Sequence, residues 1–209
     1  MDELDGAQRQ QKHEIRRSAR ARRGRQPDPE SVSLRIFDRL VQMPEYLASR
    51  TLLTYMSFHS EVSTRQFLAA ARADGKRLAV PYCVGDRLEL FRLQDGDELA
   101  PGTLGILEPR QELRGRADRR LDLGELDLIV VPGLAFDLQC GRIGYGKGYY
   151  DRLLRQISPE TAAVGVAFHC QIFREVPVLA YDVRVDKVVT ETDVYERSRP
   201  RFDGTVIWV

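Results

Sequence analysis

The fold is decided by residues 126–154, which read LDLIVVPGLAFDLQCGRIGYGKGYYDRLL. The run from Leu126 to Phe136 is apolar almost throughout, which is typical of a strand covered on both faces. Beyond the glycines, apolar residues recur at spacings of three and four: Tyr150, Leu153, Leu154 and Ile157. This spacing predicts a helix, so the glycine-rich segment is a loop that joins a strand to a helix.

Strand and helix patterns also alternate on both sides of this stretch. Strands are predicted for TLLTYMSF from Thr51, RLAVPY around Leu78, LELFRL around Leu90, AAVGVAF from Ala162 and DKVVTE from Asp186. Helical spacing follows Pro29 and covers Thr64–Ala73. The alternation predicts an α/β fold, a Rossmann-like three-layer sandwich with a mostly parallel central sheet. Its ligands would bind where loops leave the carboxyl ends of the strands.

The composition is that of a soluble globular protein. In 209 residues, 32 Lys and Arg nearly balance 31 Asp and Glu, which excludes a disordered, collagen-like or nucleic-acid-coating chain. The length favours a single domain over residues 1–209. Three cysteines without a C-x-x-C pair argue against disulfides and against a zinc site. No apolar run approaches the roughly 18 residues of a membrane span, and we expect a cytoplasmic protein.

A basic segment lies near the N-terminus. Eight Lys or Arg residues and one acidic residue, Glu14, stand between Arg9 and Arg25. Such a run is usually a solvated helix face, with phosphate contact and nucleic-acid binding as the alternatives. Lys12 and Arg16 are four residues apart, so they would lie on one helix face and could reach one anion together.

The loop itself carries four glycines: Gly141, Gly144, Gly146 and Gly148. Glycines let backbone N–H groups approach phosphate oxygens, and the start of the following helix favours an anion. A dinucleotide fingerprint that began at Gly144 would need a glycine at position 149, where Tyr149 stands. A turn kept only for packing is the remaining alternative to a phosphate site.

A second phosphate motif also fits only in part. Gly141, Gly146 and Lys147 have Walker A spacing, but Gly148 replaces the Ser or Thr that would bind magnesium. Asp151 is then the candidate metal ligand, although an acidic residue also suits the first turn of a helix. Motifs for other hydrolytic chemistry, G-x-S-x-G and H-E-x-x-H, are absent, and the three histidines lack metal-ligand spacing.

The stretch VPGLAFDLQCGRIGYGKGYYDRLL closely resembles the signature of the 5-formyltetrahydrofolate cyclo-ligase family. The resemblance extends over most of the chain, because weaker matching pieces occur in the family's order. They are Lys12 with Arg16, SFHSEVST around Glu61, GILEP at 105–109, VGVAFHCQI from Val164 and YDVRVDKVVTE around Asp186.

This resemblance implies an enzyme that uses ATP and Mg²⁺ to convert 5-formyltetrahydrofolate to 5,10-methenyltetrahydrofolate, releasing ADP and phosphate. Transfer of the γ-phosphoryl group to the formyl oxygen would create a leaving group, and the neighbouring folate nitrogen would then attack the formyl carbon. The protein would act by positioning and charge neutralisation, without a nucleophile of its own.

The resemblance also assigns the ATP side of the site. Lys12 and Arg16 correspond to the family's N-terminal phosphate contacts. The loop residues that would contact ATP are Arg142, Ile143, Gly144, Tyr145, Gly146, Lys147, Gly148, Tyr149 and Tyr150. Among them, Lys147 and Arg142 would steady the transferring phosphoryl group, and Tyr149 would lie near the reacting formyl group.

The folate and metal sides follow in the same way. Folate contacts are implied for Met56, Glu61, Tyr145, Gly146, Lys147, Gly148 and Tyr149. A carboxylate such as Glu61 suits the amino-pyrimidine edge of a pterin, because it accepts two N–H bonds side by side. Asp151 and Asp186 correspond to the family's magnesium ligands. Tyr145 departs from relatives that carry Arg or Met, so a charge at this position is not carried over.

Two other functions stay open from the residues alone. One is a nucleotide- or folate-binding relative without cyclo-ligase activity, and the other is a phosphotransferase on another small molecule. The joint presence of six residues favours the enzyme: Lys12, Arg16, Glu61, Lys147, Asp151 and Asp186. Besides ATP and 5-formyltetrahydrofolate, with or without a polyglutamate tail, we expect no membrane or nucleic-acid partner and a monomeric protein.

Overall fold

The computed structural model describes residues 2–102, 105–198 and 200–201. Its α-helices are α1 (Asp2–Gly24), α2 (Pro29–Leu40), α3 (Pro44–Ala48), α4 (Arg65–Ala73) and α5 (Tyr149–Leu154). Its strands are β1 (Thr51–Leu53), β2 (Arg77–Val84), β3 (Arg87–Leu93), β4 (Leu99–Pro101), β5 (Leu107–Pro109), β6 (Leu128–Val131), β7 (Ala135–Asp137), β8 (Arg142–Ile143), β9 (Ala162–Val166), β10 (Ile172–Phe173), β11 (Lys187–Val189) and β12 (Val194–Glu196). Among these residues, no helix is long and apolar enough to cross a membrane.

The main sheet has seven strands in the order β12-β11-β9-β6-β1-β2-β3. The inner strands from β11 to β2 pair in parallel, while β12 and β3 pair antiparallel at the two edges. This arrangement confirms the predicted α/β fold with a mostly parallel sheet. Because β6 lies between β1 and β9, the loop after β6 leaves the sheet near its middle, where ligands of such folds commonly bind.

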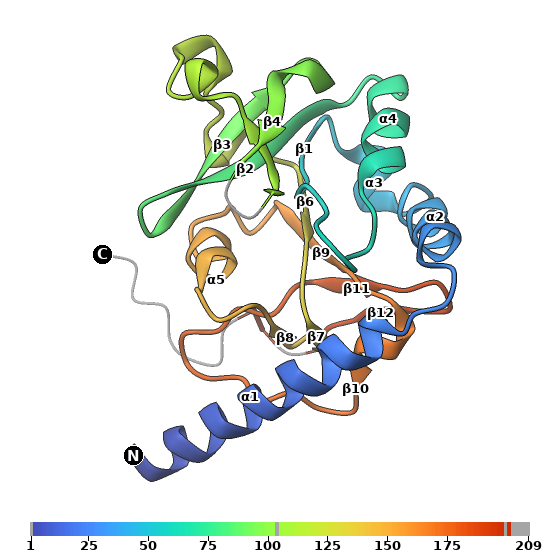
Figure 1. The fold of residues 1–209 in the computed structure, drawn as a ribbon, viewed down its shortest axis with the longest axis vertical. Helices are drawn as coiled ribbons and strands as arrows, with labels where there is room; N and C mark the ends of the chain where they lie inside the picture. The colour runs from blue at the N-terminus through green and yellow to red at the C-terminus, as the bar shows by residue number, and fades with distance from the viewer. Residues whose placement is uncertain (1, 103–104, 199, 202–209) are drawn as a thin grey trace.

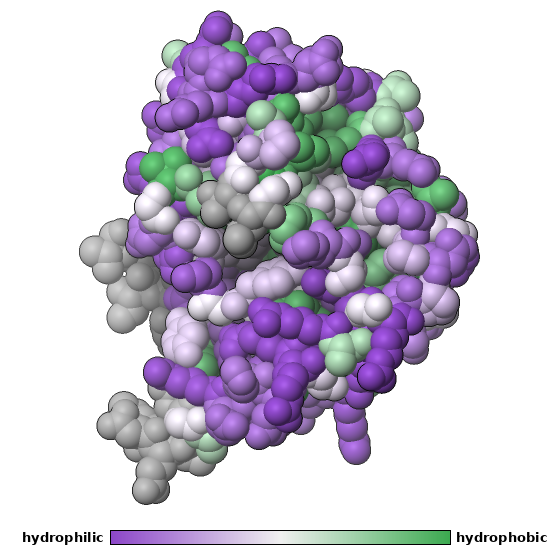
Figure 2. Space-filling model, in the orientation of Figure 1, coloured by the Kyte–Doolittle hydropathy of each residue, from purple (hydrophilic) through white to green (hydrophobic). Residues whose placement is uncertain are grey.

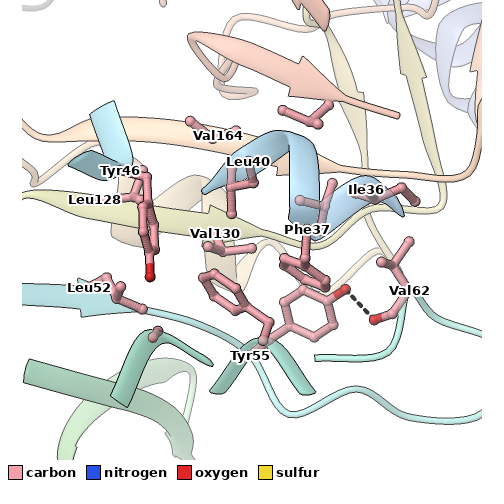
Figure 3. Close-up of a cluster of buried hydrophobic side chains, with 14 of the residues drawn as sticks. Ile36, Phe37, Leu40, Tyr46, Leu52, Tyr55, Val62, Leu128, Val130 and Val164 are labelled. Atoms are coloured by element: carbon pink, nitrogen blue, oxygen red, sulfur yellow. Dashed lines mark hydrogen bonds between the residues drawn. The ribbon is translucent and has the colours of Figure 1, made fainter. Parts of the chain in front are cut away.

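Helices cover both faces of this sheet. Successive residues of a strand point to opposite faces, so neighbouring residues pack against different helices. Leu52 packs in a cluster with residues of α2 and α4, whereas Leu53 packs with residues of α5. Figure 1 shows α2, α3 and α4 gathered on one side of the sheet and α5 on the other. In the first cluster, the Tyr55 hydroxyl donates to the Val62 carbonyl at 2.8 Å (Figure 3). Phe37 in the same cluster stacks on Phe67.

Two predicted strands are shorter than the sequence pattern suggests. The apolar run Leu126–Phe136 contains β6, a break and β7, and β7 belongs to a separate sheet with the order β10-β7-β8. Pro132 lies at the break and has no N–H for the ladder. The stretch TLLTYMSF pairs only over β1, because the chain beyond it turns to place Tyr55 in the core.

The basic segment is helical as far as Gly24 and forms part of α1. This helix lies across one end of the molecule, beside the small sheet that contains β7 and β8 (Figure 1). Its buried contact residue, Ala19, packs with Leu134, Ala135 and Ile143. The docking brings one face of the basic helix to the glycine loop, which directly follows β8.

Candidate active site

The glycine loop, residues 144–148, runs from the end of β8 to the start of α5. Gly146 and Gly148 have φ angles of 104° and 68°, which residues with a side chain rarely adopt. Gly144, Gly146 and Gly148 thus shape a loop whose tip carries the exposed residues Tyr145 and Lys147. The structure accounts for the glycines as a backbone requirement and leaves the Lys147 ammonium at the surface.

Helix α1 contacts the loop through Arg16. The Arg16 Nε donates to the Gly144 carbonyl at 2.9 Å, and its guanidinium lies against Gly146. Lys12 does not join it, because its buried ammonium is ion-paired with Asp182. Of these two residues, Arg16 contacts the loop and Lys12 does not, and their joint contact with one anion stays a prediction.

Arg142 and Asp151 form a buried ion pair beneath the loop. The Arg142 Nη2 lies 3.0 Å from Asp151 Oδ1, and the two side chains are 3% and 18% exposed. A further Arg142 nitrogen donates to the Pro132 carbonyl at 3.4 Å, just beyond the carboxyl end of β6. In this structure Asp151 thus offsets the charge of Arg142, and the role of Arg142 as a phosphoryl contact stays a prediction.

A second buried carboxylate, Glu61, meets the loop from the other side. The Tyr145 hydroxyl donates to Glu61 Oε1 at 2.7 Å, and the Phe58 N–H donates to Oε2 at 3.0 Å. Burial raises the pKa of Glu61, although the bonds from Tyr145 and Phe58 and the charge of Arg23 oppose this shift. Burial and the Glu61 charge raise the pKa of Tyr145 to about 12, so its hydroxyl keeps its proton.

Arg23, in the last turn of α1, completes this group. Its Nη2 donates to the Tyr145 hydroxyl at 2.8 Å and its Nε donates to Ser60 Oγ at 3.1 Å. The remaining nitrogen, Nη1, lies 4.0 Å from Glu61 Oε1. The structure thus brings the predicted residues Glu61 and Tyr145 together and adds an arginine that the sequence analysis did not assign.

A sequence signal for Arg23 does exist. Positions 12, 16 and 23 are spaced by four and seven, so Lys12, Arg16 and Arg23 share one face of an α-helix. All three turn toward the protein, whereas Arg17 and Arg20 are exposed. The interpretation of the segment as a solvated face holds for the second group of residues and is wrong for the first.

The two tyrosines that follow the loop, Tyr149 and Tyr150, are the first residues of α5. The Tyr149 hydroxyl donates to the Gly85 carbonyl at 3.1 Å, in the turn between β2 and β3. The Tyr150 hydroxyl is buried without a hydrogen-bond partner among the described residues, and burial raises its pKa. The loop therefore bridges helix α1 and the β2–β3 turn, and Tyr149 fixes the second of these contacts.

Two further predicted residues, Met56 and Ile143, pack in hydrophobic clusters. Met56, which follows β1, is half-buried against the core cluster below α2. Ile143 is fully buried beside Ala19, so its side chain contributes packing and only its backbone lies near the loop. In Figure 2, hydrophobic residues gather in a hollow near the middle of the face shown, above the hydrophilic surface of α1.

Asp186 lies away from the loop, at the start of β11. It accepts hydrogen bonds from Arg197 Nε at 2.8 Å, from Arg201 Nε at 2.8 Å and from the Ala163 N–H at 2.8 Å. Ala163 is near the amino end of β9, whereas Pro132, which binds Arg142, follows the carboxyl end of β6. In this structure Asp151 and Asp186 therefore lie at opposite ends of the parallel strands, and their role as magnesium ligands stays a prediction.

The described residues contain no group of three or more His, Cys, Asp or Glu side chains able to hold a metal ion. Asp151 Oδ1 is engaged by Arg142 and also accepts the Val183 N–H at 3.2 Å. A cation beside Asp151 would have to use its other oxygen and ligands from a bound molecule. This donor set suits Mg²⁺ carried by a nucleotide, since Mg²⁺ is typically held by one or two carboxylates and substrate phosphates.

The residues around the glycine loop form two different binding surfaces. Lys147 and Arg16 provide positive charge at the surface of the glycines, which suits a phosphate group. Glu61 and Arg23 provide a buried acceptor and donor on the far side of Tyr145, which suits a planar polar molecule. A reaction that joins a phosphorylated and a heterocyclic substrate would fit this geometry.

Comparisons with known proteins agree with one another. The 5-formyltetrahydrofolate cyclo-ligase family matches residues 8–191 of the chain. A Schizosaccharomyces pombe protein named a probable 5-formyltetrahydrofolate cyclo-ligase is 33% identical over 79% of this chain and 86% of its own. The Escherichia coli K12 5-formyltetrahydrofolate cyclo-ligase is 31% identical over 76% of this chain and 87% of its own.

A solved structure extends the likeness to three dimensions. The 5,10-methenyltetrahydrofolate synthetase of Aquifex aeolicus superposes with a TM-score of 0.77 at 31% sequence identity. The match covers 94% of this chain and 97% of that protein. By sequence and by fold, the chain belongs to the 5-formyltetrahydrofolate cyclo-ligase family.

Proposed function

We infer that the protein is an ATP-dependent 5-formyltetrahydrofolate cyclo-ligase that produces 5,10-methenyltetrahydrofolate, ADP and phosphate. The observation that carries this conclusion is the contact between the glycine loop and Glu61 through Tyr145. It joins a surface suited to phosphate and a carboxylate suited to a pterin within one hydrogen-bonded unit. Family membership supplies the reaction, and this contact supplies a reason why one loop could serve both substrates.

The reaction needs ATP because the formyl oxygen is a poor leaving group. The formyl oxygen attacks the γ-phosphorus, ADP leaves, and the formyl carbon becomes an electrophile bonded to phosphate. The second folate nitrogen then forms a bond to this carbon, loses its proton, and phosphate departs with the oxygen. The protein has to hold the reacting atoms together and offset negative charge during phosphoryl transfer.

We assign the phosphate side to Lys147 and Arg16. Lys147 is exposed at the tip of the loop, and Arg16 reaches the loop from α1, so both can meet a triphosphate laid over the glycines. Arg142 acts indirectly in this proposal, because its ion pair with Asp151 joins β8 to the first turn of α5. Arg142 is thus a positioning residue for the loop and for Asp151.

We assign the folate side to Glu61, with Tyr145 and Met56 beside it. The ionised Glu61 would accept the amino and ring N–H groups of the pterin, and Met56 would offer an apolar surface for the ring. The Tyr145 hydroxyl now bonds to Glu61 Oε1, so it would yield this oxygen when the substrate binds. Tyr149 supports the loop from the β2–β3 turn.

We propose that Mg²⁺ enters with ATP and meets Asp151 through the carboxylate oxygen that Arg142 does not hold. Asp151 would hold the ion through this oxygen, and the bound ion would supply positive charge during phosphoryl transfer. We also propose a cytoplasmic location, in keeping with three free cysteines. A monomeric state and acceptance of polyglutamate tails remain predictions.

The proposed function is tested by following near-ultraviolet absorption of the methenyl product. Purified protein with 5-formyltetrahydrofolate, Mg²⁺ and ATP should give a rise in this absorption, and omission of ATP should abolish it. A flat trace from folded protein in the complete mixture would contradict the proposed function. Release of ADP without the absorption change would indicate a phosphotransferase that acts on another substrate.

A further inference from the structure

Arg23 is buried at a cost that its protein contacts only partly offset. It is 5% exposed, and of its three guanidinium nitrogens two donate to neutral hydroxyls, those of Ser60 and Tyr145. The Nη1 atom is buried and has no hydrogen-bond partner within the described part of the chain. A buried charged donor without an acceptor is expensive, and it calls for an explanation such as a bound ligand or water.

The place of this nitrogen indicates what the partner is. Nη1 lies 4.0 Å from Glu61 Oε1, which is too long for a hydrogen bond but close enough for both atoms to face one small group. Arg23 Nη1 is a hydrogen-bond donor and Glu61 Oε1 is an acceptor. Together they would complement a ligand edge that carries an acceptor for Arg23 beside a donor for Glu61. The oxo group and adjacent ring N–H of a pterin form such an edge.

We propose that Arg23 binds the ring oxo group of the folate's pterin while Glu61 accepts the neighbouring N–H groups. This inference rests on the proposed function and adds to it the residue that reads the oxo position. Arg23 then acts as a specificity-determining residue supplied by the basic helix α1. Its contact with the Tyr145 hydroxyl would also link the arrival of the folate to the glycine loop.

The alternative is that Arg23 serves only to fasten α1 to the loop around Ser60. The two hypotheses predict different effects of an Arg23 substitution on the relative affinities for different pterins. A purely structural arginine would alter the affinities for all pterins by the same factor. An arginine that donates to the oxo group would favour a pterin with this oxo group over a pterin with an amino group in the same position. The amino group is itself a hydrogen-bond donor and cannot accept the bond from Arg23.

The test uses folic acid and its 4-amino analogue as competitors in the cyclisation assay. For Arg23→Met, we expect the inhibition constant of folic acid to rise about tenfold or more relative to that of the 4-amino analogue, since a hydrogen bond to a charged group is lost. The KM for 5-formyltetrahydrofolate should rise by a similar factor, and the KM for ATP should stay within about twofold. Arg23→Lys should recover part of the discrimination.

Arg17→Met is the matched control, because Arg17 is an exposed arginine on the same helix. It removes the same charge and should leave all four constants unchanged. If Arg23→Met changes both inhibition constants equally, or changes neither, the proposal is overturned even though the wild-type enzyme works. If Arg23→Met does not fold, the same ratio measured for Arg23→Lys decides. A wild-type protein that neither binds nor converts the folate contradicts the proposed function itself.

Discussion

Two buried carboxylates of this protein, Glu61 and Asp186, show how differently one functional group is used at opposite edges of the sheet. Asp186 receives two arginine side chains and a backbone N–H at the amino edge. Glu61 receives one tyrosine hydroxyl and one backbone N–H near the glycine loop, with an arginine 4.0 Å away. Asp186 is fully partnered by the protein, whereas Glu61 is only partly partnered.

The pKa shifts of the two groups follow this difference. Burial acts to raise the pKa of Asp186, but hydrogen bonds from Arg201, the Ala163 N–H and Arg197 outweigh it and lower the pKa. For Glu61 burial prevails, and its pKa is raised. A buried carboxylate that the fold has not fully stabilised is available to a ligand, and this is the physical reason to place the folate at Glu61.

The largest expected effect is on stability, at Asp186. Asp186→Asn removes the carboxylate charge that Arg197 Nε and Arg201 Nε face at 2.8 Å, so the free energy of unfolding should fall by about 3 kcal/mol. Urea unfolding at pH 7 measures this loss. Asp118→Asn, which breaks the exposed pair with Arg116, is the control and should leave the unfolding midpoint unchanged. An equal midpoint for Asp186→Asn and wild type would remove Asp186 from its structural role.

A large effect on substrate affinity is expected at Glu61. Glu61→Gln keeps the size of the side chain but loses a charged acceptor, so the KM for 5-formyltetrahydrofolate should rise about tenfold to a hundredfold. The KM for ATP and the unfolding midpoint should change little. Initial rates at varied concentrations of each substrate give both constants, and an unchanged folate KM would exclude Glu61 from the folate site.

A smaller effect is expected when the ion pair below the loop is disturbed. A Cβ on Gly144 would lie 2.8 Å from Arg142 Nη1, so Gly144→Ala should push the guanidinium away from Asp151. Misplacement of the loop should lower kcat about tenfold. Gly124→Ala is the control, since a Cβ there meets nothing within 4 Å. Equal kcat values for the two variants would show that Arg142 is free to move without consequence.

The smallest effect is the pH dependence of stability, which has opposite signs at the two sites. The raised pKa of Glu61 means that its contribution to stability is complete below its ordinary value of 4.5 and is lost as the pH rises through the shifted pKa. The lowered pKa of Asp186 means that its contribution is present above its ordinary value of 3.8 and is lost as the pH falls.

Urea unfolding between pH 3 and pH 8 can separate these contributions. As the pH rises from 3 to 8, the free energy of unfolding of the wild type should fall relative to that of Glu61→Gln. Over the same rise in pH, it should increase relative to that of Asp186→Asn. Parallel curves for all three proteins would show that the two carboxylates do not differ.

The parallel sheet could be predicted from sequence because buried strands leave long apolar runs, and these formed β6, β9 and β11 close to the expected places. The end of the predicted strand near Val131 agrees with β6, but the second strand, β7, is not foreseen, since an apolar run does not show when a chain leaves one sheet for another. Pro132 was the available signal.

The candidate site could be predicted only in outline. The resemblance singled out Glu61 and the glycine loop, which the fold brings into contact. The ion pair of Lys12 with Asp182 could not be foreseen, because it joins residues 170 positions apart that only the docking of α1 brings together. Arg23 was missed for the same reason, since a basic face on an isolated helix does not reveal which surface it will meet.

The central claim, that the folate binds at Glu61 and that Asp186 serves the fold, is tested most directly by calorimetric titration of 5-formyltetrahydrofolate without ATP. Wild type, Glu61→Gln and Asp186→Asn would be compared at pH 7 and at a temperature where all three are folded. We predict that Glu61→Gln binds at least about tenfold more weakly than wild type and that Asp186→Asn binds as wild type does. Wild-type affinity in Glu61→Gln, or lost affinity in folded Asp186→Asn, would contradict the account.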